Sequence, residues 1–180
     1  MSTKENKWTR RHFLKATGTA GLGALMAPVN GMATAAETPT KVPARPFGRT
    51  GVNVSILSLG GMFNIKSNQM LMKQAMRWGV TYWDTADCYQ SGSEKGIGKY
   101  FKKYPRDRQK VFLVSKSDAR SPDGMTDLLD RSLKRMNTDY IDLYFVHGIY
   151  SIDELDDRTR AWAEQARAAG KIRFFGFSTH

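Results

Sequence analysis

Four residues of this 180-residue chain have side chains suited to acid–base chemistry, and each ends or follows an apolar run. Asp84 and Tyr89 lie five residues apart in the stretch TYWDTADCY. Lys116 ends the run VFLVSK, and His147 ends the run LYFVH. A nearby ammonium stabilises a phenolate, and a carboxylate in turn keeps that ammonium charged and oriented. With an imidazole to polarise a carbonyl, such a group would protonate an alkoxide as a hydride arrives.

The elements that must position these residues form a repeat. Apolar runs that predict strands begin near Val80, Val111, Tyr140 and Ile172, about 30 residues apart, and an earlier run covers Ile56 to Leu59. Segments with a helical apolar face lie between and after them. Their marker residues are Leu71, Ala75 and Trp78; Ile97, Phe101 and Tyr104; Leu129, Leu133 and Met136; and Leu155, Trp162, Ala166 and Ala169. Strand, helix and strand at this spacing predict βαβ units with parallel strands.

Two α/β architectures fit such a repeat, an open doubly wound sheet and a (β/α)8 TIM barrel. The strands are apolar on both faces, as expected of a sheet covered on both sides. The first strand is followed by Gly60-Gly61-Met62-Phe63, which is not a GxGxxG phosphate-binding turn, so we favour the barrel. We count five strands and four helices, about half of a barrel. Barrel active sites lie at the carboxyl ends of the strands, so the four residues and Ser178 should meet at one mouth.

Several polar residues are expected to have structural roles. Ser91 with Glu94, and Ser151 with Glu154, have the spacing of a capping box, so we assign Glu94 to a helix cap. Ser121, followed by Pro122 and Asp123, predicts another helix start, and Gly79 and Gly170 lie where helices should turn into strands. We expect Asp142, within a strand, to be a structural ion-pair or hydrogen-bond partner.

The composition restricts the class of function. The chain is 41% hydrophobic and 25% charged, as in a globular protein, and has a formal net charge of +11. Of this charge, +4 lies in the first 35 residues, and the remaining +7 forms no basic run with interleaved aromatics. The sequence therefore favours an anionic ligand, such as a phosphorylated cofactor, and predicts no nucleic-acid binding. Cys88 is the only cysteine, which excludes an internal disulfide; we interpret it as a small apolar filler.

The N-terminus has the parts of an export signal. The stretch TRRHFLK, from Thr9 to Lys15, resembles a twin-arginine signal, and Ala16 to Ala27 form a mild apolar segment. Ala33-Thr34-Ala35 offers a small-residue cleavage site. The sequence thus predicts a signal peptide over residues 1–35, a linker over 36–46 and a barrel domain over 47–180. The twin-arginine translocation machinery would be a partner, and the expected location is periplasmic or otherwise extracytoplasmic.

The order and spacing of several segments resemble the aldo-keto reductase superfamily. These segments, from Phe47 to Ser178, are FGRTG with VSILSLGG, then WDTADCY, GSEKGIGKYF, FLVSK, SLKRMNTDYIDLYFVH and GKIRFFGFS. The resemblance implies reduction of aldehydes or ketones by NADPH or NADH, or the reverse oxidation of an alcohol. It places the catalytic tetrad on Asp84, Tyr89, Lys116 and His147, with Tyr89 as general acid. It places cofactor contacts on Gly61, Met62, Asp84 and Ser178; where the family has an asparagine after that serine, this chain has Thr179.

Three other interpretations fit the sequence. A metal-dependent barrel hydrolase would need ligand pairs, but the histidines are only His12, His147 and His180, so we predict no metal site. A non-catalytic cofactor-binding module of the same fold would keep the cofactor without turnover. An incomplete, inactive fragment is the third, because the cofactor phosphate site of such barrels lies after strands 7 and 8. On that view the 180-residue chain alone binds NADPH weakly or not at all. Substrate identity, choice of NADPH or NADH, and oligomeric state do not follow from the sequence.

Overall fold

The computed structural model describes residues 41–89 and 92–179 of the chain. The expected signal peptide over residues 1–35, the first part of the expected linker, Ser91 and His180 lie outside the described residues. None of the helices within the described ranges is long and apolar enough to cross a membrane.

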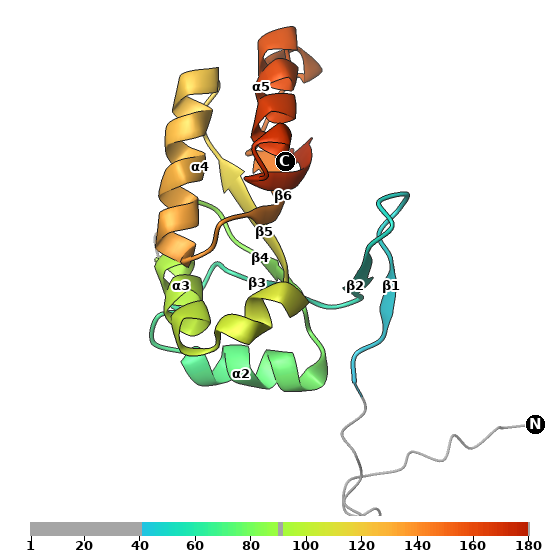
Figure 1. Cartoon of the computed structure of the whole chain (residues 1–180), viewed down its shortest axis with the longest axis vertical. Coiled ribbons are helices and arrows are strands. Elements are labelled where there is room, and N and C mark those ends of the chain that lie inside the picture. Colours follow the sequence, from blue (N-terminus) through green and yellow to red (C-terminus); the bar gives the residue numbers. More distant parts are fainter. Residues whose placement is uncertain (1–40, 90–91, 180) are drawn as a thin grey trace, which may run out of the picture. The chain divides into compact units, whose positions relative to one another are not determined.

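In these ranges a β-hairpin precedes five parallel strands that alternate with four α-helices (Figure 1). The hairpin pairs β1 (Ala44–Pro46) with β2 (Asn53–Ser55). The sheet runs in chain order: β3 (Ser58–Gly60), β4 (Tyr82–Asp84), β5 (Phe112–Ser117), β6 (Ile141–Val146) and β7 (Ile172–Phe177). The helices are α2 (Gln69–Trp78), α3 (Ser93–Lys103), α4 (Pro122–Met136) and α5 (Asp157–Ala168), with short 3-10 helices η1 (Pro105–Lys110) and η2 (Ile152–Glu154). Consecutive parallel strands joined by helices are the βα units of a barrel, so the predicted element count is confirmed.

Two boundaries differ from the prediction. The first barrel strand begins at Ser58, and Ile56 and Leu57 before it are 52% and 56% exposed. An apolar run alone did not distinguish the strand from the turn that leads into it. The hairpin also begins inside the segment expected to be a linker, because Ala44–Pro46 forms β1 and pairs with β2.

The buried face of α2 is rotated relative to the expected one. Met72 and Ala75 are buried, whereas Leu71 and Trp78 are 43% and 46% exposed. Adjacent helical residues point about 100° apart, so shifting the stripe from Leu71 to Met72 turns the whole face. At the far end of the sheet, Leu155 and Ala169 lie just outside helices η2 and α5.

The helix ends confirm some predicted caps and correct one. The Ser121 hydroxyl accepts a hydrogen bond from the Gly124 N–H at the start of α4, and Ser151 and Glu154 form a capping box on η2. Helix α3 instead begins after Gly92, in the left-handed conformation at φ 65°, without a side-chain cap. Glu94 therefore does not cap α3; it is buried and takes part in the site described below.

The strands alternate their side chains between two apolar layers. Trp83, Leu113 and Tyr144 face the helices, whereas Tyr82, Phe112 and Leu143 belong to a second cluster on the opposite face. Helices α3 and α4 pack side by side against the first layer (Figure 1), and a Cβ on Gly98 of α3 would collide with the Arg135 carbonyl of α4. Since strand side chains repeat every two residues, Asp84 shares the interior face of Tyr82, and Lys116 that of Phe112.

The hairpin lies at the amino ends of the strands, away from the predicted site. Phe47, which follows β1, packs edge-on against Tyr82 and Phe112 with ring centroids 6.2 and 5.4 Å apart. Tyr82 and Phe112 are the first residues of β4 and β5. Asp84 is the last residue of β4, and Lys116 lies one residue from the end of β5.

A buried ion pair connects η1 to the sheet. One Asp142 carboxylate oxygen, Oδ2, accepts hydrogen bonds from the Arg108 guanidinium and from the Leu113 backbone N–H, each at 3.0 Å. The other oxygen pairs with Arg173 at 2.6 Å. Asp142 and Arg108 have side chains only 2% and 8% exposed, so the predicted structural role of Asp142 is confirmed.

Replacing Asp142 by alanine should lower the free energy of unfolding by about 3–5 kcal/mol, because it leaves the buried Arg108 charge without a counterion. Asp130→Ala is a matched control, since that carboxylate pairs with Lys171 at 2.6 Å but both side chains are well exposed. Its loss should be about 1 kcal/mol or less. Urea unfolding followed by circular dichroism measures both; equal losses would contradict a structural role specific to Asp142.

Candidate active site

The Lys116 ammonium is the centre of the candidate site. Its Nζ donates hydrogen bonds to Asp84 Oδ1 at 2.6 Å, to the Thr85 carbonyl at 2.8 Å and to the Tyr89 hydroxyl at 3.1 Å. An ammonium has three N–H donors, so each one has an acceptor. The residue is only 6% exposed, and all three acceptors come from β4 and the loop that follows it. Three of the four predicted catalytic residues therefore form one hydrogen-bonded group.

Two tyrosines lie near Asp84, and the structure distinguishes them. Tyr89 is half-buried and contacts the Lys116 ammonium through its hydroxyl. Tyr82 lies two residues before Asp84 on the same strand face; burial, and next the Asp84 charge, raise the pKa of Tyr82 to about 12. Of the two phenols, only that of Tyr89 therefore contacts the Lys116 ammonium.

Charged residues behind the 85–89 loop hold its shape. The Asp87 carboxylate pairs with Arg131 of α4 at 2.6 Å, and the Asp87 N–H donates to the Lys116 carbonyl. Burial of the carboxyl, and next the Asp118 charge, raise the pKa of Asp87, and the ion pair with Arg131 opposes that rise.

Glu94 of α3 also helps to hold the 85–89 loop in place. Its carboxylate accepts hydrogen bonds from the Ser115 hydroxyl at 2.9 Å and from Arg135 at 3.2 Å. Arg135 also donates to the Asp87 carbonyl. The sequence suggested a cap for Glu94, because the serine three residues earlier gave a simpler local partner than the distant Arg135.

His147 is the first residue after β6, beside the tyrosine. The His147 and Tyr89 rings meet edge-on with centroids 6.1 Å apart. Arg120 fixes the backbone here, since its guanidinium donates to the His147 carbonyl at 2.8 Å and pairs with Glu154 of η2 at 2.6 Å. The fourth predicted catalytic residue therefore adjoins the other three.

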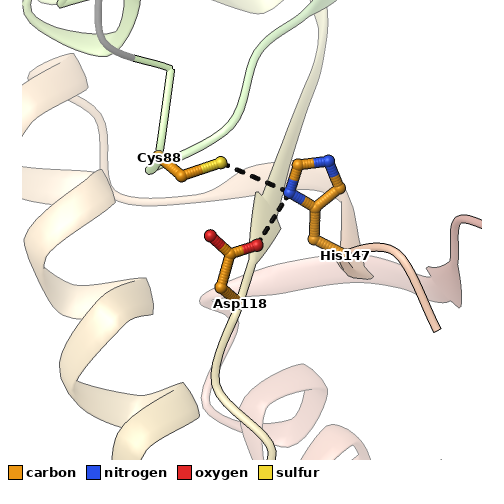
Figure 2. A group of neighbouring side chains, drawn as sticks. All are labelled: Cys88, Asp118 and His147. Atoms are coloured by element: carbon orange, nitrogen blue, oxygen red, sulfur yellow. Dashed lines mark hydrogen bonds and ion pairs between the residues drawn. The ribbon is translucent and has the colours of Figure 1, made fainter.

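Two further residues, Asp118 and Cys88, contact the His147 ring (Figure 2). Its Nδ1 lies 2.9 Å from Asp118 Oδ1 and 3.4 Å from Cys88 Sγ. Sequence reasoning missed Asp118, although its place directly after β5 was a usable signal. Cys88 was expected to be an apolar filler, but it is exposed. Desolvation of the sulfur, and next its hydrogen bond to Asp118, raise the pKa of Cys88 to about 11.

The residues suggested for cofactor contact also lie at the carboxyl ends of the strands. Gly61 directly follows β3 and Ser178 directly follows β7, while Met62 is 79% exposed. A Cβ on Gly61 would come within 2.6 Å of the Asp84 carbonyl, so only glycine permits this approach of the two strand ends. The Ser178 hydroxyl accepts a hydrogen bond from the Gly148 N–H at 2.9 Å.

Comparison with known proteins identifies the family of this chain. Residues 57–180, which include every strand-end residue described above, match the aldo/keto reductase family. The chain belongs to the aldo/keto reductase family. Among solved structures, this aldo/keto reductase chain is similar to the holo form of an aldo-keto reductase from Bacillus halodurans. The two are 31% identical with a TM-score of 0.68, over 78% of this chain and 50% of the other, in agreement with the predicted (β/α)8 barrel.

Curated members of the family are similar at comparable identity. The NADP(+) aldo-keto reductase yakc of Schizosaccharomyces pombe is 34% identical over 150 residues, which covers 76% of this chain and 42% of the relative. The methylglyoxal reductase YeaE of Escherichia coli is 36% identical over 118 residues, covering 63% of this chain and 39% of that protein. This aldo/keto reductase chain spans about half the length of the curated relatives it matches.

The raised pKa of Cys88 predicts slow alkylation. At pH 8 a thiol with a pKa of about 11 is almost wholly protonated, whereas an unperturbed thiol with a pKa of about 8.5 is about one quarter thiolate. Even after allowing for the greater nucleophilicity of a more basic thiolate, iodoacetamide should react at least about tenfold more slowly with the folded protein.

Mass spectrometry over time measures this rate without ambiguity, because Cys88 is the only cysteine. The same protein unfolded in urea is the control, and it should react at the ordinary rate. Asp118→Asn should accelerate alkylation of the folded protein, since it removes a negative charge that disfavours the thiolate. Equal rates in the folded and unfolded protein would contradict the prediction.

Proposed function

We propose that this chain carries the catalytic residues of an NADP(H)- or NAD(H)-dependent oxidoreductase that interconverts small aldehydes or ketones and the corresponding alcohols. The observation that supports it most directly is the Lys116 ammonium, shared between the Asp84 carboxylate and the Tyr89 hydroxyl. The names of similar proteins, which include an NADP(+) aldo-keto reductase and a methylglyoxal reductase, agree with this class of reaction.

In reduction, the hydride that reaches the carbonyl carbon would come from a bound nicotinamide cofactor. Tyr89 donates its hydroxyl proton to the carbonyl oxygen, which leaves the alcohol and a phenolate. The ammonium of Lys116, 3.1 Å from that oxygen, stabilises the phenolate. Asp84 holds the ammonium in place, and His147 beside the Tyr89 ring orients the carbonyl by hydrogen bonding. Oxidation of an alcohol follows the same steps in reverse, with Tyr89 as base.

The residues at the strand ends fit a nicotinamide carboxamide. The Ser178 hydroxyl accepts a hydrogen bond from the Gly148 N–H, and within residues 41–89 and 92–179 the hydroxyl itself donates to no acceptor. It is therefore available to a carboxamide oxygen. Gly61 and the exposed Met62 would contact the same group from the other edge of the sheet.

Replacing Tyr89 by phenylalanine should lower kcat by about 10²- to 10⁴-fold, because it removes the general acid. Binding of NADPH should change little, since the substitution deletes only one hydroxyl. The assay uses the whole protein as its gene encodes it, with NADPH or NADH and a panel of aldehydes and ketones that includes methylglyoxal. Fluorescence titration reports cofactor binding separately.

Tyr104→Phe is the matched control, since this tyrosine lies at the end of α3, away from the strand ends. Its kcat should equal that of the unchanged protein. Turnover by Tyr89→Phe at the unchanged rate would show that the reaction does not use this tetrad. Cofactor binding without turnover in the unchanged protein would instead favour the non-catalytic module.

We also propose that the protein is exported by the twin-arginine pathway to a periplasmic or other extracytoplasmic location. The supporting observation is the stretch TRRHFLK, followed by a mild apolar segment and a small-residue cleavage site. Replacing both Arg10 and Arg11 by lysine should keep the protein in the cytoplasmic fraction. Fractionation and immunoblotting measure this, and export of the double variant would contradict the proposal.

A further inference from the structure

Three side chains of different ligand type converge at the mouth of the candidate site. Cys88, Asp118 and His147 each offer one ligand atom, a thiol sulfur, a carboxylate oxygen and an imidazole nitrogen (Figure 2). All three atoms lie within 4.8 Å of one another. The reaction proposed above uses neither Cys88 nor Asp118, so their convergence on His147 needs another explanation.

Each side chain comes from a separate strand end. Cys88 lies on the loop after β4, whereas Asp118 and His147 directly follow β5 and β6. The backbone beneath them is fixed, because the His147 N–H donates to the Ser117 carbonyl at 2.9 Å and the Asp87 N–H donates to the Lys116 carbonyl. Adjacent parallel strands therefore hold the three groups together, which local sequence spacing does not reveal.

The distances approach those of a tetrahedral metal site. With zinc–sulfur bonds of about 2.3 Å and zinc–nitrogen or zinc–oxygen bonds of about 2.0 Å, a tetrahedron separates sulfur from nitrogen by about 3.5 Å and nitrogen from oxygen by about 3.3 Å. Here Cys88 Sγ and Asp118 Oδ1 lie 3.4 and 2.9 Å from His147 Nδ1. The Asp118 side chain is 53% exposed, so it can turn by the few tenths of an ångström required.

Both contacts converge on a single ring nitrogen. His147 Nδ1 offers one in-plane hydrogen or one lone pair, yet a carboxylate and a thiol both approach it. Without a metal, hydrogen bonds that share the available protons hold the group together. A divalent cation that binds sulfur, nitrogen and oxygen would replace those protons and accept all three ligands at once.

We propose that Cys88, Asp118 and His147 form a site for a divalent cation of the zinc class, with its fourth position open to water or substrate. An imidazole bound through Nδ1 carries its remaining proton on Nε2. Metal occupancy would therefore fix the tautomer of His147, and the effect of that tautomer on a bound carbonyl rests on the proposed reductase function. The binding itself does not depend on that function.

Cobalt(II) titration of the purified protein tests the site directly. One equivalent should produce thiolate-to-cobalt charge-transfer absorption in the near ultraviolet and strong visible bands of tetrahedral geometry. The thiolate signal can arise only from Cys88, because the chain has no other cysteine. Zinc should displace the cobalt and abolish both signals. The readout needs no turnover, so failure of the reductase proposal leaves it unaffected.

Two variants and one control complete the test. Cys88→Ser should abolish the charge-transfer absorption, and Asp118→Asn should weaken cobalt affinity at least about tenfold, the cost of losing even an outer partner at many metal sites. Asp123→Asn, at the start of α4, should bind cobalt as the unchanged protein does. Absence of the charge-transfer band in the unchanged protein, or unaltered affinity in Asp118→Asn, would overturn the proposal.

Discussion

The site is organised by the need to neutralise one buried cation. Lys116 lies on the interior face of the sheet, where the neighbouring side chains are apolar, and it is only 6% exposed. An ammonium in such surroundings is stable only with acceptors for its protons, and removing a partner from a buried ion pair costs about 3–5 kcal/mol. All three acceptors come from residues 84–89, so this loop must fold around the cation. The same contacts that stabilise the fold bring the Tyr89 phenol to the ammonium.

Ion pairs also hold the opposite side of that loop. Asp87 pairs with Arg131, and Glu94 pairs with Arg135, whose guanidinium reaches the Asp87 carbonyl as well. The acceptors of Lys116 are thus positioned by α3 and α4, the two helices that pack closely at Gly98. Asp142 and Arg108 form a separate buried pair that joins η1 to β5 and β6. Helix packing and the geometry of the candidate site are therefore coupled through ion pairs whose carboxylates, those of Asp87 and Glu94, are buried.

The strand-end residues could be predicted from the sequence because their positions depend on local periodicity. Contacts between residues far apart in the chain could not be predicted in this way. Strand spacing located Asp84, Lys116 and His147 at strand ends, because parallel strands of a βα repeat place their carboxyl ends at one edge. It did not show that Glu94 reaches Ser115 and Arg135, because those partners are 21 and 41 residues away. The buried face of α2 was also misjudged, since composition cannot distinguish Leu71 from the adjacent Met72 when both are apolar.

The neighbours of the His147 ring restrict which hydrogen bonds the ring can make. If Nδ1 donates its hydrogen to Asp118, a neutral ring has only a lone pair at Nε2 and cannot donate to a substrate carbonyl. Donation from Nε2 would then require a hydrogen on both ring nitrogens. A metal ion on Nδ1 would act in place of that proton and leave the hydrogen on Nε2. In the proposed metal site, the carboxylate and the thiol would together determine whether Nε2 of His147 carries a hydrogen.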